Sequence, residues 1–134
     1  MIPKFRAWDK EGNRMILPKY LYSIDLLKEQ VTERTKCNYT FSLHSIPLDK
    51  VELMQSTGLL DAFGTEIFEG DIVTKNQGET FGVIRYGICR SSLCFYVEQN
   101  YKGSELTFPI NTNFSRYYKV VGNIYENPEL LEVE

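Results

Sequence analysis

Histidine and cysteine, which supply many metal ligands and nucleophiles, are scarce in this chain of 134 residues. It has one histidine, His44, and three cysteines, Cys37, Cys89 and Cys94. The odd number of cysteines argues against a disulfide framework, and their spacing matches no zinc motif. We therefore expect reduced thiols packed as small apolar groups, a solvent-facing strand histidine, and neither a metal site nor a cofactor.

The sequence also lacks a long apolar run and the common catalytic signatures. No stretch approaches the roughly 20 apolar residues of a membrane span. Charged residues follow Lys4 and Arg6, where a signal peptide would continue with an apolar segment. The patterns GxGxxG, GKS or GKT, HExxH and GxSxG are absent. We expect a cytoplasmic protein that is not an enzyme of an easily recognised class.

Positive charge is in deficit overall. The chain has 18 acidic and 15 basic residues, a net charge of -3, which argues against indiscriminate binding to nucleic acid. The charge is unevenly distributed, however. Residues 71–125 carry six basic and four acidic side chains, and residues 126–134 carry four glutamates and no base. A local anion-binding site within 71–125 is therefore one open interpretation.

Aromatic residues are abundant, with nine tyrosines and eight phenylalanines, and such residues favour the pleated surface of a sheet. Phe5 and Ala7 alternate with Arg6 and Trp8 as in a strand, and a turn over residues 9–13 leads to a return strand. The pattern predicts a mainly β protein with little helix, beginning with a hairpin and a meander of strands.

Residues 20–35 fit two patterns. Leu21, Ile24 and Leu27 have helical spacing, whereas residues 20, 22, 24 and 26 alternate as in a strand. Because the surrounding chain is rich in β signals, we favour two strands, 20–27 and 30–35.

The next strand is predicted to begin at Asn38 and to end at Pro47. It would carry Tyr39, Phe41 and Leu43 on one face. Another strand is expected to pass through residues 51–55.

From residue 71 onward, five short strands lie about ten residues apart, which indicates a small barrel or sandwich. The segments GDIV and GVI resemble the opening of SH3-like barrels. We therefore divide a single domain into a meander part, 1–60, and an SH3-like part, 61–134. The final NPELLEVE predicts one helical turn, with Asn127 as N-cap and Pro128 at the first helical position. The expected strands are 72–74, 81–87, 93–97, 106–110 and 117–125.

The stretch GTEIFEGDIV, residues 64–73, combines turn glycines with acidic residues. Glu69 and Asp71 stand two positions apart, so in an extended strand they would share a face and could bind a cation or divide acid and base roles. Gly70 interrupts that geometry, and no partner base is visible. We favour a solvated turn in which Asp71 accepts hydrogen bonds from nearby backbone N–H groups.

Three segments together resemble the signature blocks of the YopX family: IPKFRAWDKEGNRM, VELMQSTGLLDAFGTEIFEGDIV and VVGNIYENPELL. This family consists of small proteins encoded in bacterial phages and prophages. The resemblance implies β structure, a phage-related origin and the cytoplasm of a bacterial host cell. It implies no catalytic residue, because the family has no established enzymatic activity. Leu60, Ala62 and Phe63 depart from the family pattern and make this turn more apolar. The matching residues have structural roles: Trp8, Gly58, Gly64, Gly70, Asp71, Gly122, Asn127 and Pro128.

Three functional hypotheses follow. The first is an accessory protein without enzymatic activity that binds a host or phage protein, or a second copy of itself, through exposed strand edges and aromatic residues. The alternative is a single-stranded nucleic-acid-binding barrel that combines stacking with backbone charge. A third reading, a hydrolase or metal enzyme at Glu69 and Asp71, requires a concave pocket. The nucleic-acid candidates are Arg85, Arg90, Tyr101, Lys102, Arg116 and Tyr117.

Overall fold

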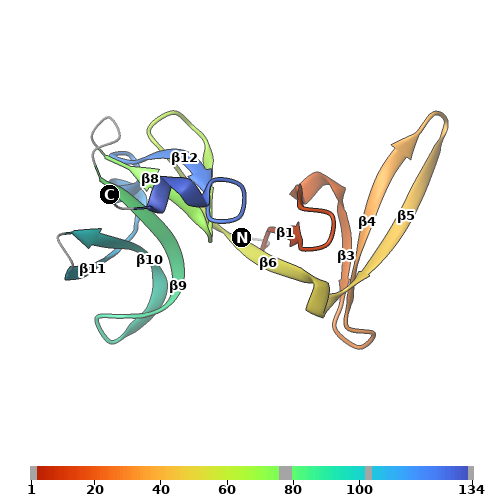
Figure 1. Cartoon of the computed structure of the whole chain (residues 1–134), viewed down its shortest axis with the longest axis horizontal. Helices are drawn as coiled ribbons and strands as arrows, with labels where there is room; N and C mark the ends of the chain where they lie inside the picture. The colour runs from red at the N-terminus through yellow and green to blue at the C-terminus, as the bar shows by residue number, and fades with distance from the viewer. Residues whose placement is uncertain (1–2, 76–79, 102–103, 133–134) are drawn as a thin grey trace. The chain divides into compact units, whose positions relative to one another are not determined.

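The computed structural model describes residues 3–75, 80–101 and 104–132, and the side chains of all these except 100, 101, 104 and 114. It is mainly β, and its longest helix has four residues among those described, which confirms the predicted fold class (Figure 1). The chain forms two compact units, and their border lies between Gln55 and Ser56 within strand β6 (Val51–Leu60). We call them the N-terminal and C-terminal units. The predicted division after residue 60 lies at the end of this same strand.

The N-terminal unit contains two antiparallel groups of strands. β1 pairs with β2 and with the first part of β6, and β3, β4 and β5 form a three-stranded sheet in that order. The predicted hairpin at the N-terminus is therefore confirmed. The elements are β1 (Phe5–Asp9), β2 (Arg14–Ile16), the 3-10 turn η1 (Pro18–Tyr20), β3 (Leu21–Asp25), β4 (Gln30–Cys37), β5 (Thr40–Pro47) and the 3-10 turn η2 (Leu48–Lys50).

Residues 20–35 contain two strands, as favoured, and not a helix. The first runs only from Leu21 to Asp25, shorter than the predicted 20–27, and the second begins at residue 30 as predicted. Val31 of β4 lies opposite Ile46 of β5, and both are buried in the core of the N-terminal unit. The carboxylate of Asp25 accepts hydrogen bonds from the N–H groups of Leu27 and Lys28, which closes the turn between β3 and β4. Leu27, which would have extended a helical stripe, is therefore exposed.

The strand predicted from Asn38 begins two residues later, at Thr40. Asn38 has φ +53°, and Asn38 and Tyr39 form the two-residue turn that joins the paired residues Cys37 and Thr40. Asparagine tolerates this left-handed conformation better than most residues, so it favours a turn at the point where we placed a strand start. Tyr39 is consequently at the tip of a hairpin.

The C-terminal unit contains a five-stranded antiparallel sheet in the order β11-β10-β9-β8-β12, while β7 pairs with the last part of β6. In Figure 1, β9 and β10 run side by side as long curved strands. The core holds Ile67, Val73, Ile84, Val97 and Tyr118 among others. The expected five strands are present, whereas the SH3-like arrangement stays a prediction. The elements are β7 (Glu66–Phe68), β8 (Asp71–Thr74), β9 (Phe81–Cys89), β10 (Ser92–Tyr101), β11 (Ser104–Pro109), α1 (Thr112–Ser115), β12 (Lys119–Asn123) and the 3-10 turn η3 (Pro128–Leu131).

The last strand is shorter than predicted. It begins at Lys119, and a short helix, α1, which the sequence pattern did not reveal, precedes it. Tyr118 comes before the strand and is fully buried in the core, while its neighbour Tyr117 is exposed. The register of β12 shifts between Val120 and Gly122. Alternation alone did not reveal this boundary, because the buried tyrosine belongs to a turn that packs on the sheet.

Asn127 does not cap the following helical turn as predicted, although it occupies the N-cap position. Its side chain makes no capping hydrogen bond; instead, its Oδ1 accepts a hydrogen bond from the Asn123 N–H at 3.2 Å. This arrangement requires Gly122, because a Cβ there would lie 2.4 Å from that same oxygen. Two residues of the family signature therefore fit against each other at the end of β12.

We expect the substitution Gly122→Ala to destabilise the C-terminal unit by about 1–3 kcal/mol, since the new methyl group displaces Asn127. Gly87→Ala is the matched control, because a Cβ in that strand meets only Tyr96, at 3.7 Å, an ordinary van der Waals distance. Urea unfolding of both variants measures the difference. Equal unfolding midpoints for the two variants would contradict this account of Gly122.

Candidate interaction surfaces

The acidic stretch at residues 64–73 fixes a turn from inside the protein. Asp71 is only 2% exposed, and its Oδ2 accepts a hydrogen bond from the N–H of Phe68 at 2.7 Å. The predicted bond to backbone N–H is present, but the expectation that this carboxylate stays in water is wrong. Glu66 accepts a hydrogen bond from the Ser56 hydroxyl at 2.5 Å. In the described parts of the chain, no three His, Cys, Asp or Glu residues are grouped so as to hold a metal ion.

A second buried carboxylate, Asp61, has a larger role than its position in a turn suggested. Its Oδ1 accepts hydrogen bonds from the N–H groups of Phe63 and Thr65, and its Oδ2 accepts one from Val120 at 2.9 Å. The last bond connects the turn to β12, 59 residues away in sequence. No local pattern reveals such a partner, so sequence reasoning missed this contact.

The expected packing of the thiols holds for Cys89 and Cys94 but is wrong for Cys37, which is exposed at the end of β4. Cys89 is buried and Cys94 half-buried, and the turn between β9 and β10 brings them together. Burial, followed by the neighbouring Cys89, raises the pKa of the Cys94 thiol. A thiol with a raised pKa is a poor nucleophile at neutral pH, in line with a packing role. His44 is exposed on β5, opposite Glu33.

The nucleic-acid candidates of the C-terminal unit lie on three separate elements. Arg85 is half-buried in the middle of β9, and Arg90 is exposed in the turn that ends this strand. Arg116 and Tyr117 are exposed between α1 and β12. Lys102 and the side chain of Tyr101 lie outside the described residues.

The far end of the β9–β10 hairpin presents an uncharged apolar surface. Ile88 lies opposite Leu93 and Tyr86 opposite Phe95, and side chains that face each other across an antiparallel pair share one face. The Tyr86 and Phe95 rings contact each other with centroids 4.7 Å apart. We call these four residues the apolar hairpin face.

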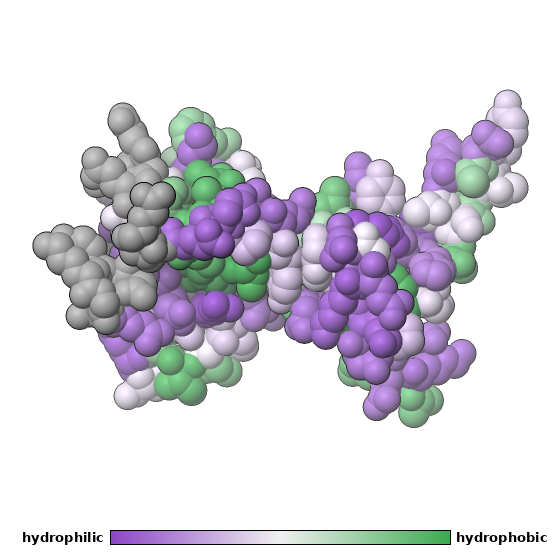
Figure 2. Space-filling view, in the orientation of Figure 1, coloured by the Kyte–Doolittle hydropathy of each residue, from purple (hydrophilic) through white to green (hydrophobic). Residues whose placement is uncertain are grey.

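The apolar hairpin face adjoins the core of the C-terminal unit along the same two strands. The next pair along the two strands, Ile84 and Val97, is fully buried, whereas Ile88 is 72% and Leu93 62% exposed. Figure 2 shows hydrophobic surface on the C-terminal unit near this end of β9 and β10. Residues 84–88 and 93–97 place no charged side chain on this face, because Arg85, the one charged residue among them, points to the opposite face. Exposed apolar surface of this kind is typical of a binding site.

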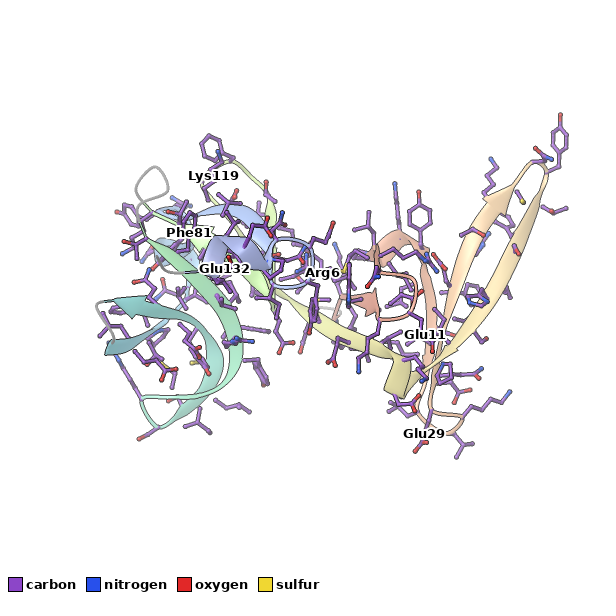
Figure 3. All side chains as sticks on the ribbon, in the orientation of Figure 1. Arg6, Glu11, Glu29, Phe81, Lys119 and Glu132 are labelled. Carbon is purple, nitrogen blue, oxygen red and sulfur yellow. The ribbon has the colours of Figure 1, made fainter. Side chains whose placement is uncertain are left out.

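The second surface is a projecting hairpin of the opposite character. All residues from 34 to 45, the outer halves of β4 and β5, are exposed, and β3 pairs with β4 only as far as Glu33. Figure 1 shows this hairpin extending from the N-terminal unit, and Figure 3 shows side chains on both sides of it. It contains Arg34 and Lys36 but no acidic residue. We call residues 34–45 the basic arm.

Two aromatic rings lie close to the arginine of the basic arm. The guanidinium carbon of Arg34 lies 3.6 Å from the centroid of the Phe41 ring and 5.9 Å from that of Tyr22, on β3. Lys36 lies directly opposite Phe41 in the register, and Leu43 opposite Arg34. The same face therefore combines two cations with exposed aromatic and apolar groups. Sequence reasoning missed this cluster because its members come from three strands.

A forked ion pair holds the base of the basic arm. Arg14 on β2 donates through Nη1 and Nη2 to the two carboxylate oxygens of Glu33 on β4, at 2.6 and 2.5 Å. Its Nε also lies 3.4 Å from Asp9. Glu33 is buried, and the hydrogen bond from Arg14 is the main reason that its pKa lies below the usual value. The same bond raises the pKa of Arg14.

Comparison with known proteins gives a family and a structural relative. A family model described as "YopX protein" matches residues 4–132. The crystal structure of protein EF1440 from Enterococcus faecalis is similar, with 26% sequence identity and a TM-score of 0.54 over 98% of this chain and 99% of that one. No curated protein matches significantly. Among the described residues, no helix has the length and apolar character to span a membrane.

The substitution Glu33→Gln is expected to lower the free energy of unfolding by about 1–3 kcal/mol at neutral pH, because it removes a charge-assisted fork. Since the folded-state pKa of Glu33 is lowered, its stabilisation is complete above its ordinary pKa of 4.5 and is lost as the pH falls through the folded-state value. The variant should therefore lose less stability than the wild type between neutral and acid pH. Urea unfolding as a function of pH measures this.

Glu52→Gln is the matched control for that variant. It removes an ion pair with Lys10 at 3.0 Å in which both side chains are nearly half exposed, so its cost should stay below about 1 kcal/mol. If both variants show the wild-type pH dependence, the fork does not stabilise the N-terminal unit.

Proposed function

The chain belongs to the YopX family, and on that premise we propose that it is a phage- or prophage-encoded accessory protein that works by binding, without enzymatic activity, in the cytoplasm of a bacterial host cell. The family resemblance supports the phage-related context. The observation that carries the binding role is the apolar hairpin face, an exposed cluster of large apolar groups that is continuous with the core and free of charge.

The occupant that this surface fits best is the same surface of a second copy of the chain. Each copy carries a net charge of -3, but the face itself is uncharged, so two copies that meet face to face bury no unpaired charge. Cores of protein interfaces are depleted of charged residues and enriched in aromatic ones, as this face is. A two-fold interface needs only one patch that is complementary to itself.

The alternative function, binding of single-stranded nucleic acid by residues 71–125, is supported by Arg116 and Tyr117. The two are adjacent and exposed, so that a cation stands next to an aromatic ring. Salt-dependent binding of single-stranded DNA that is lost on replacement of Arg85 or Arg116 by Gln would favour this alternative over self-association.

The double substitution Ile88→Ser and Leu93→Ser tests the self-association. We expect the wild type to dimerise and the variant to show a dimer dissociation constant raised at least about a hundredfold, because four exposed apolar side chains leave the two-fold interface. Sedimentation equilibrium over a concentration series measures both constants.

The matched control is Leu26→Ser with Leu27→Ser, which removes two exposed leucines from a turn of the N-terminal unit and should leave the dimer unchanged. A wild type that stays monomeric at high protein concentration rejects self-association. A hairpin variant that dimerises like the wild type shows that this face is not the interface.

A further inference from the structure

The basic arm differs from the rest of the molecule in its charge. The whole chain has a net charge of -3, yet the twelve residues 34–45 contain Arg34, Lys36 and no carboxylate. No described carboxylate forms an ion pair with either cation, whereas Arg14, Lys10 and Lys50 of the same unit each have at least one. Two uncompensated cations on an extended hairpin attract a polyanion.

We propose that the basic arm, together with Tyr22, binds single-stranded nucleic acid. The phosphates would meet Arg34 and Lys36, and the unpaired bases would stack on the exposed rings beside them. Proteins that bind single strands without sequence preference combine these two features, a positively charged track and aromatic rings that accept any base. The site goes beyond the apolar hairpin face and does not depend on it.

The position of Arg34 supports both parts of this assignment. With its guanidinium carbon 3.6 Å from the Phe41 centroid, the cation is held over an aromatic face, and its N–H groups stay available for phosphate oxygens. Phe41 is still 57% exposed, so part of the ring remains free for a base. Tyr22, equally exposed, extends the stacking surface on the neighbouring strand.

The aromatic content favours a single strand over other polyanions. Bases in a duplex are stacked on one another, so a double helix offers phosphates and base edges but no free ring faces. An acidic peptide would match the two cations but would offer no planar group to Phe41 and Tyr22.

Contacts at the base of the arm hold its two strands in place. A two-stranded ribbon that is exposed on both faces is only marginally stable in isolation. Here the fork between Arg14 and Glu33 fixes β4 immediately before the arm begins, and the hydroxyls of Thr32 and Ser45 are 3.0 Å apart across the two strands at its base.

Fluorescence anisotropy with end-labelled oligo-dT of roughly 15 nucleotides tests the proposal, a length within the range of known single-strand sites. We expect the wild type to bind at low salt. The logarithm of the association constant should fall with the logarithm of the salt concentration with a slope of about -1.4, the value for two phosphate contacts. Arg34→Gln with Lys36→Gln should weaken binding at least about tenfold and flatten this slope. Lys28→Gln with Lys119→Gln is the matched control, because it makes the same change in net charge at two exposed lysines outside the arm and should have little effect.

The stacking contribution is tested separately at Phe41. Phe41→Ser should weaken oligo-dT binding about tenfold, whereas Phe41→Tyr, which keeps the ring, should retain it. Because the side chain is more than half exposed, Phe41→Ser should fold, and thermal unfolding followed by circular dichroism checks this.

Four results would overturn the assignment. They are no binding at low salt, an equal loss in the Lys28 and Lys119 variant, binding of the matching DNA duplex as tight as that of the single strand, and binding of labelled polyglutamate as tight as that of oligo-dT. The last would indicate an acidic protein partner. Retention of binding by the Ile88→Ser, Leu93→Ser variant would show that the arm acts independently of the apolar hairpin face.

Discussion

The fork between Arg14 and Glu33 is the contact on which the N-terminal unit depends. A carboxylate that is buried as deeply as Glu33 keeps its charge only if a cation and good hydrogen bonds replace the water it has lost. Arg14 supplies both through two parallel hydrogen bonds. The contact joins β2 of one group of strands to β4 of the other. The exposed part of β4 begins at the next residue, Arg34. Because its base is fixed, the basic arm can extend beyond the last residue of β4 that pairs with β3.

The C-terminal unit uses buried side-chain oxygens in a different way. Asp61, Asp71 and Asn123 each accept hydrogen bonds from backbone N–H groups in turns. Backbone groups in buried turns have no strand partner, so side chains must satisfy them. This explains why the most recognisable stretch of the chain, GTEIFEGDIV, is a family marker whose acidic residues are structural.

Each unit carries one of the two proposed binding surfaces. The apolar hairpin face is free of charge and suits a like surface, whereas the basic arm is free of acid and suits a polyanion. Both are the outer ends of hairpins whose inner ends are packed in a core. A strand pair that extends beyond its core exposes alternating side chains without a change of fold, so a small β protein can carry two unrelated binding chemistries.

Alternation and turn residues in the sequence were enough to predict the β class, the N-terminal hairpin and the five strands after residue 71, because strand and turn preferences are set by neighbouring residues. The family was recognised separately, from the resemblance of three segments to its signature blocks. Tertiary structure alone decided the rest. Asn127 turns back to Asn123 where a cap was expected, Asp71 is buried where a solvated carboxylate was expected, and Asp61 reaches Val120. The cluster of Tyr22, Arg34 and Phe41 likewise exists only because three strands meet in one register. Such contacts depend on which distant segments become neighbours, and local periodicity carries no information about that.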